Sequence, residues 1–195
     1  LGRLGRHCLL FHQRHVLAMP PAVDISIDGF ESFELSRYFP FQHHVAVDNR
    51  TGMFLWFTDS PLRRKGRMTA HQRRRRADLE RIWGRPDPQA VRKDMMELLH
   101  VVAGGAQQVK VRSDDHHAYR HAIAALPSVG AWVITSSKER RNRRNPLWEI
   151  NLLDLLIRHS SSNHKRETLA WSKRRQASAW RLASRRFNNA LPSRA

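Results

Sequence analysis

Three things are scarce in this sequence: cysteine, long apolar runs and acidic side chains. Cys8 is the only cysteine, so the chain can form no internal disulfide and no cysteine-based zinc site, which favours a reducing compartment such as the cytoplasm. No apolar run approaches the ~20 residues of a transmembrane helix. Residues 1–19 carry arginines and lack the long apolar core of a secretion signal. Within the 195 residues of this sequence, a transmembrane helix and an internal disulfide framework are therefore excluded.

The scarcity of acidic residues leaves the chain strongly basic. There are 17 aspartates and glutamates against 35 lysines and arginines, which gives a formal net charge of +18 with every histidine neutral. Such an excess attracts polyanions and speeds the encounter with them, although it says nothing about the fold. Nucleic acid is therefore the first candidate partner. An anionic membrane would require a basic amphipathic helix or a lipidation signal, and neither is clear here, so no membrane partner is expected.

The first part of the chain has the pattern of three antiparallel strands. Asp24–Phe30 alternates and is rich in β-branched residues, which is typical of a strand. The next two predicted strands, His44–Asp48 and Met53–Thr58, are joined by the short polar loop Asn49–Gly52. A loop of this length and composition is a hairpin signature.

Helices and strands alternate after Pro61, where arginine and lysine become dominant. Thr69 is a suitable N-cap for a basic helix that runs toward Trp83 and is followed by prolines. The remaining pattern predicts, in order, helix 89–102, strand 108–112, helix 116–126, strand 131–135, helix 147–159 and a basic helix 166–187. Three antiparallel strands followed by such an alternation predict an α/β fold of the ribonuclease H-like class, with a mixed sheet.

Three aspartates occupy places where phosphodiester chemistry with two metal ions would need them. Such chemistry requires two or three carboxylates that converge from different segments, because the ions take oxygen ligands and hold both the attacking and the leaving oxygen. Asp28 lies inside the first strand and Asp114 directly follows the fourth. Asp154 lies in helix 147–159, which is apolar nearly all round and is expected to pack into the core.

Each aspartate also has an ordinary structural interpretation. Asp28 could face solvent on an alternating strand, and Asp114 could cap the helix that follows it. Asp154 could be neutralised by Arg158 one turn later on the same helix. Residue type and spacing alone leave these alternatives open.

The segments around these aspartates resemble the core of bacterial insertion-sequence transposases with a DDE active site. The resemblance runs from Val23 to Gln176 and rests on Ile27–Phe33, Ser113–Tyr119 and Asn151–Lys173. In that family the first Asp lies in a strand of the form Ile-Asp-x-x-x-Ser-Phe, and the second has a tyrosine five residues on. The third acid lies on a helix that precedes a Ser-Lys pair. The three motifs occur here in the family's order.

The third motif departs from the family's pattern. The family's helix reads Glu-x-x-Asn-x-x-x-Arg, whereas this chain has Asn151, Asp154 and Arg158, so that the acid and the amide are exchanged. Residues three apart share a helix face, so Asp154 could reach the metals from one turn later. Glu149 is the reserve acid. It lies two positions from Asn151, which is about 200° around a helix and therefore toward the opposite side.

The resemblance implies an enzyme that cleaves DNA and transfers strands in DNA transposition, located in the bacterial cytoplasm at the nucleoid. Asp28, Asp114 and Asp154 would hold two Mg²⁺ or Mn²⁺ ions, and Asn151 and Arg158 would orient the acids or contact a phosphate. The implied partners are double-stranded DNA (element ends and target) and further copies of the chain in a homo-oligomer assembled on DNA. The alternatives are a catalytically inactive remnant or another non-catalytic nucleic-acid-binding protein, and a ribonuclease H-like nuclease of another kind.

Two basic segments are predicted to bind DNA. They are Arg63–Arg76 and Lys165–Arg186. Many basic helices simply present a solvated face, but so concentrated an excess of positive charge, without interleaved acids at Arg73–Arg76, favours contact with backbone phosphates. Contacts of this kind go to backbone phosphates and position DNA without reading its sequence. The predicted contact residues are Arg63, Arg64, Lys65, Arg73, Arg74, Arg75, Arg76, Lys165, Arg166, Lys173, Arg174 and Arg175.

The expected organisation places the catalytic domain at residues 23–187, with a basic helical insertion at 61–105. Residues 1–22 are expected to be an N-terminal remnant or linker and residues 188–195 a disordered tail. Too few residues precede Asp24 for the DNA-recognition module that such transposases carry, which makes truncation a hypothesis.

Two pairs of adjacent histidines, His43–His44 and His116–His117, raise the question of zinc. Adjacent residues of a strand point to opposite faces and cannot easily bind one ion. We therefore expect these side chains to face solvent or to contact phosphate.

Overall fold

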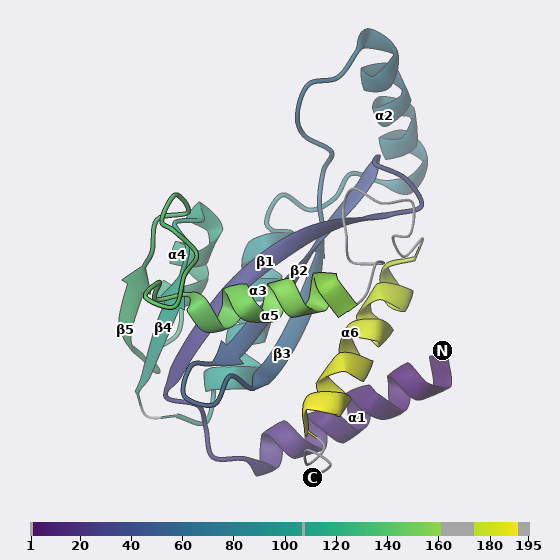
Figure 1. The fold of residues 1–195 in the computed structure, drawn as a ribbon. Helices are drawn as coiled ribbons and strands as arrows, with labels where there is room; N and C mark the ends of the chain where they lie inside the picture. Colours follow the sequence, from purple (N-terminus) through teal and green to yellow (C-terminus); the bar gives the residue numbers. More distant parts are fainter. Residues whose placement is uncertain (1, 107, 161–173, 191–195) are drawn as a thin grey trace.

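A computed structural model describes residues 2–106, 108–160 and 174–190 of the protein (Figure 1). Its five strands are β1 (Asp24–Glu34), β2 (Phe39–Asp48), β3 (Phe54–Pro61), β4 (Val109–Ser113) and β5 (Val129–Ile134). They form one sheet in the order β3-β2-β1-β4-β5. The first three are antiparallel neighbours, whereas β4 is parallel to β1 and β5 is parallel to β4. The predicted ribonuclease H-like class of fold, with its mixed sheet, is confirmed.

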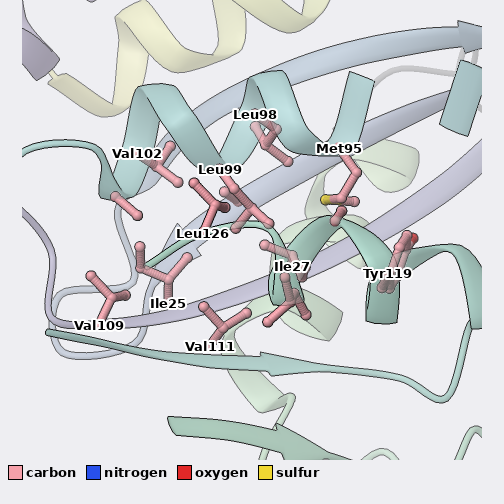
Figure 2. Packing of buried hydrophobic residues seen from close by; sticks show 14 of the residues in the cluster. Ile25, Ile27, Met95, Leu98, Leu99, Val102, Val109, Val111, Tyr119 and Leu126 are labelled. Carbon is pink, nitrogen blue, oxygen red and sulfur yellow. The ribbon is translucent and has the colours of Figure 1, made fainter. Parts of the chain in front are cut away.

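One face of the sheet is covered by α3 (Ala90–Ala103) and α4 (His117–Ala124). Ile25 and Ile27 point to this face because they alternate along β1, and neither retains any exposed surface. Leu98 of α3 packs into the same cluster (Figure 2). These contacts fix β1, and with it Asp28, at the centre of the molecule.

The opposite face is covered by α5 (Trp148–Ser160), which crosses β1 and β2 (Figure 1). Leu153 and Ile157 of α5 pack against Phe30 of β1 in a second buried cluster. Asp28 lies two residues before Phe30 and therefore points to the face that α5 covers. Helix α5 packs into the core as expected, through Ile150, Leu153 and Ile157. Its other side is open, since Leu155 is 60% exposed.

The predicted basic helical insertion at 61–105 contains two helices of different character. Helix α2 (Ala70–Trp83) begins with a capping box formed by Thr69 and Gln72, has no buried residue, and extends away from the sheet (Figure 1). Helix α3 buries an apolar face in the core. Only α2 and the loops beside it therefore project from the domain.

The chain's first helix, α1 (Gly2–Ala18), lies within residues 1–22, which were predicted to be an N-terminal remnant or linker. It lies along α6 (Arg175–Ala190), which continues past the predicted end of the domain at residue 187 (Figure 1). The helices approach closely at Gly5, where an added Cβ would lie 2.4 Å from Cβ of Trp180. His12 ties α1 to the sheet, since its Nε2 donates to the carbonyl of Leu55 at 2.7 Å.

The expectation of solvent-facing or phosphate-contacting histidines is wrong for His43 and His44. Both are fully buried, because the antiparallel partners on β1 and β3 and the helices on both faces enclose β2. His43 Nε2 lies 2.7 Å from Ser178 Oγ, and His44 Nε2 lies 2.7 Å from Ser60 Oγ. Burial lowers the pKa of His44 to about 3, and the nearby His116 adds to this effect.

None of the helices in the described part of the chain combines the length and the apolar character that crossing a membrane requires.

Candidate active site

Asp28 stands in the middle of the central strand β1, opposite Val45 of β2. Its side chain is half-buried, and its Oδ1 accepts a hydrogen bond of 2.7 Å from the backbone N–H of Gly29. The simple alternative of a solvated strand aspartate does not describe this position, because α5 covers the face to which the side chain points.

Asp114 follows the neighbouring strand β4. The parallel register pairs Ser26 with Arg112, so Asp28 and Asp114, each two residues further along, lie next to each other where the strands part. Asp114 Oδ1 accepts from the backbone N–H of His116 at 3.1 Å, and the N-cap of α4 is His116. Asp114 therefore stabilises the start of α4 and also stands beside Asp28.

Asp154 comes from α5, on the face of the helix that covers β1. Its side chain is 12% exposed, and Oδ1 lies 3.1 Å from Nε of Arg158, whose side chain is 45% exposed. The ion pair considered as an alternative to a functional role is thus present. The ion pair does not exclude a functional role, because the negative charge of Asp154 also raises the pKa of Asp28.

The electrostatics of these carboxyls are linked. The pKa of Asp28 is raised to about 7, first by burial and then by the negative charges of Asp114 and Asp154, against the opposing effects of the Gly29 N–H and of Arg141. The pKa of Asp154 is also raised by burial, although Arg158 and Arg141 pull it down. The three predicted acids therefore come together from β1, β4 and α5.

Tyr119 supports this cluster from α4. The ring is buried, and burial raises the pKa of its hydroxyl well above the ordinary value. The negative charges of Asp28 and Asp114 raise this pKa further. The hydroxyl hydrogen-bonds to the side chain of Gln42 on β2. Both side chains press on Gly29, where an added Cβ would lie 2.1 Å from Gln42 Nε2 and 3.0 Å from the Tyr119 hydroxyl. A side chain at Gly29 would therefore displace the Gln42 amide, which is hydrogen-bonded to Tyr119.

The reserve acid points elsewhere. Glu149 Oε2 lies 3.3 Å from the position that a Cβ on Gly52 would occupy, so this carboxylate is at the turn between β2 and β3. The predicted supporting amide of Asn151 donates to the carbonyl of Leu147 at 2.8 Å, within its own helix. Of the two predicted supporting residues, Arg158 contacts an acid and Asn151 does not.

Arg141 and Gln42 were not singled out from the sequence. Arg141 is an exposed residue of the basic loop before α5, and its charge lowers the pKa of both Asp28 and Asp154. The concentration of basic residues in this loop was visible in the sequence. Gln42 carried no such signal, because only the strand register brings it to Tyr119.

The donor set suits a hard cation. Among the described residues, no three histidine, cysteine, aspartate or glutamate side chains lie in positions that could already share a metal ion. However, Asp28, Asp114 and Asp154 offer only oxygen ligands, and a divalent ion would offset both the burial that raises the pKa of Asp28 and the neighbouring negative charges that add to this effect. The residues therefore fit the predicted Mg²⁺ or Mn²⁺ once their side chains close on an ion.

Several predicted DNA-binding residues near α2 already have partners. Arg63 forms two hydrogen bonds to Glu80, at 2.8 and 2.9 Å, and Arg76 lies 3.5 Å from the same carboxylate. The Arg64 guanidinium stacks over the ring of Tyr38 at 4.3 Å. These contacts hold the loop before α2 against the helix and fix the positions of its cations.

The other predicted DNA-binding residues differ in exposure. Lys65, Arg73, Arg74, Arg75 and Arg174 are exposed, and Arg73 also donates to a backbone carbonyl. Arg175 forms an ion pair with Asp59 at 3.0 Å. Lys165, Arg166 and Lys173 lie outside the described residues.

Comparisons with known proteins yield similarities of fold. No protein-family model and no curated protein matches the sequence. Ribonuclease H1 from the archaeon Halobacterium salinarum is 16% identical at a TM-score of 0.31, over 68% of this chain and 97% of that one. An N-terminal ribonuclease H domain from Mycobacterium tuberculosis is 13% identical at a TM-score of 0.32, over 71% of this chain and 99% of that one. The pre-cleavage Mos1 transpososome is 10% identical at a TM-score of 0.31, over 96% of this chain and 59% of that one. The assignment of the fold rests on the strand order.

Proposed function

We propose that the protein is a DDE-type transposase that cleaves DNA and joins strands with the help of divalent metal ions. The observation that carries this proposal is the meeting of Asp28, Asp114 and Asp154, from three separate elements, in one electrostatically linked cluster on a ribonuclease H-like sheet. Buried carboxylates that repel one another are costly unless a cation joins them, so a cluster of this kind favours a functional site.

The three carboxylates would hold two Mg²⁺ or Mn²⁺ ions, which supply activation of the attacking oxygen and stabilisation of the leaving oxygen. Asp154 would turn from Arg158 to its ion, which frees the guanidinium for a phosphate oxygen. Arg141 is placed to attract the same phosphate, because its charge already acts on Asp28 and Asp154. Tyr119 and Gln42 would keep Asp28 in place from behind.

A non-catalytic nucleic-acid-binding protein is the second candidate. It is favoured by the ion pair between Asp154 and Arg158, which gives the third acid a structural role without a metal. Another ribonuclease H-like nuclease is the third candidate, and it would nick nucleic acid without joining strands. The predicted homo-oligomer on double-stranded DNA belongs to the transposase proposal.

Cleavage and joining of labelled DNA that carries the flanking element ends test the proposal. We expect activity with Mg²⁺ or Mn²⁺ in the wild type, and a loss of at least about 10³-fold in Asp28→Asn, Asp114→Asn and Asp154→Asn, since the three act as one unit. Glu149→Gln is the matched control and should retain activity.

Each outcome distinguishes the candidates. Cleavage without strand joining would favour another nuclease. DNA binding with no cleavage in either metal would contradict the enzyme and favour the non-catalytic protein. Loss of activity in Glu149→Gln with retention in Asp154→Asn would overturn the assignment of the third acid.

A further inference from the structure

A pocket of about 510 Å³ lies on the side of the sheet that α3 and α4 cover and is lined by segments that are distant in the sequence. Glu31 and Gln42, which pair between β1 and β2, line it and point to the face opposite to that of Asp28. They are the basic loop before α2, the connection Arg85–Pro88 between α2 and α3, and the start of α4 at His116–Ala118. Two contacts join the pocket to the candidate active site. The backbone N–H of His116 donates to Asp114, and Gln42, which also lines the pocket, hydrogen-bonds to Tyr119.

The lining of the pocket is rich in positive charge. Its cations are Arg63, Arg64, Lys65, Arg76 and Arg85, and its carboxylates are Glu31 and Asp87. Asp87 is held by Lys93 at 2.6 Å, so it competes little for the cations of the lining. Lys65 and Arg85 are exposed at the rim, where they can meet an anion without the loss of internal packing.

The lining also carries flat and apolar surface. The rings of His116 and His117 stack with centroids 4.8 Å apart and an interplanar angle of 22°. Further apolar contacts come from Pro61, Leu62, Met68, Pro86, Pro88 and Val91. Cations for phosphates together with flat apolar surface for bases are the combination that binds single-stranded nucleic acid.

We propose that this pocket binds a nucleotide-sized unit of single-stranded nucleic acid. The volume lies within the range of pockets that take small ligands, and a duplex is too wide to enter it. The proposal goes beyond the proposed function, because the pocket lies across the sheet from the carboxylates that would perform the cleavage, and the ligand's identity rests on the residues of the lining. The strand would enter by the rim at Lys65 and Arg85, with its phosphates on the cations and a base on the two imidazoles.

Two arginines on α2 carry the same charge as Lys65 and Arg85 but lie outside the pocket, so they serve for comparison. Arg74 and Arg75 are exposed on α2, are predicted to bind DNA, and do not line the pocket. They can meet the backbone of a duplex, but a strand short enough to occupy the pocket alone does not reach them. A general attraction of polyanions would depend on them as much as on the pocket.

The test is the affinity of a short, fluorescently labelled oligothymidine, measured by anisotropy at several salt concentrations in EDTA. The pocket variant is Lys65→Glu/Arg85→Glu. The first control is Arg74→Glu/Arg75→Glu on α2, and the second is Arg14→Glu/Arg50→Glu on exposed surface of α1 and of the β2–β3 turn. Thermal melting shows that each variant is folded, which we expect because all six side chains are exposed.

We expect the pocket variant to bind the oligothymidine roughly tenfold more weakly or worse, with a salt slope lower by about 1.4 for two lost phosphate contacts. Both controls should stay within about twofold of the wild type. Equal losses in the pocket variant and the α2 variant, or an unchanged affinity in the pocket variant, would overturn the proposal. Because binding is measured without metal, a protein that fails to cleave DNA can still pass this test, and an active enzyme can fail it.

Discussion

Replacement of Asp28 by asparagine should stabilise the metal-free protein at neutral and alkaline pH. The pKa of Asp28 is about 7 in the folded protein and 3.8 as its ordinary value. The folded protein therefore keeps a proton that the unfolded chain releases. The stability that this proton contributes is complete below pH ~4 and is lost as the pH rises through about 7.

The magnitude follows from the two pKa values. A difference of about three units corresponds to roughly 4 kcal/mol above pH ~7, and partial exposure of the side chain reduces this to about 2 kcal/mol. Asparagine keeps an oxygen that can accept from the Gly29 N–H, so the hydrogen bond survives the substitution. Asp28→Asn should thus be more stable than the wild type by about 2 kcal/mol at about pH 8, and by less at about pH 5.

Urea denaturation in EDTA at both pH values measures this effect. His44 acts in the opposite direction, because its lowered pKa makes the folded state lose stability as the pH falls below about 6.5. This contribution is common to both proteins, so the difference between their two curves isolates Asp28. If the difference in stability between Asp28→Asn and the wild type does not change with pH, Asp28 is not the group that titrates and the prediction is wrong.

The remaining predictions concern close packing. Gly29→Ala should cost about 1–3 kcal/mol in urea denaturation, because its Cβ would overlap Gln42. Gly5→Ala should cost a similar ~1–3 kcal/mol, because its Cβ would meet Trp180 and push α1 from α6. Gly105→Ala is the control for both, since its Cβ would lie 3.7 Å from its nearest neighbour, an ordinary contact. Equal stabilities of the three variants would contradict both predictions.

The strands and most helices were predictable because local patterns agree with the tertiary structure. Alternation around Ile25 and Ile27 predicted β1, and Thr69 correctly marked the start of α2. Helix α1 was missed, although Gly5, Cys8 and His12 recur at helical spacing and form its buried face. The small and polar residues on that face gave no apolar stripe, and only the tertiary contact with Trp180 explains them.

The candidate site was predictable in its residues but not in its contacts. A match to three short motifs proposed Asp28, Asp114 and Asp154, and the fold brings them together. Helix geometry favoured Asp154 over Glu149 from the sequence, but the contact of Asp154 with Asp28 depends on how α5 lies across β1, which the sequence does not show. The neighbours Gln42 and Arg141 depend on strand register and on the path of a loop, which local patterns do not contain.

A calorimetric titration of the metal-free wild type with Mn²⁺ tests most directly whether the three aspartates bind metal. It is done near pH 7, in buffers of different ionisation enthalpy. We expect binding to be accompanied by the release of a proton, since Asp28 must ionise to hold the metal. Binding and proton release should both disappear in Asp28→Asn and persist in Glu149→Gln. Absence of binding in the wild type, or unchanged binding in Asp28→Asn, would contradict the claim that these three aspartates form a metal-dependent active site.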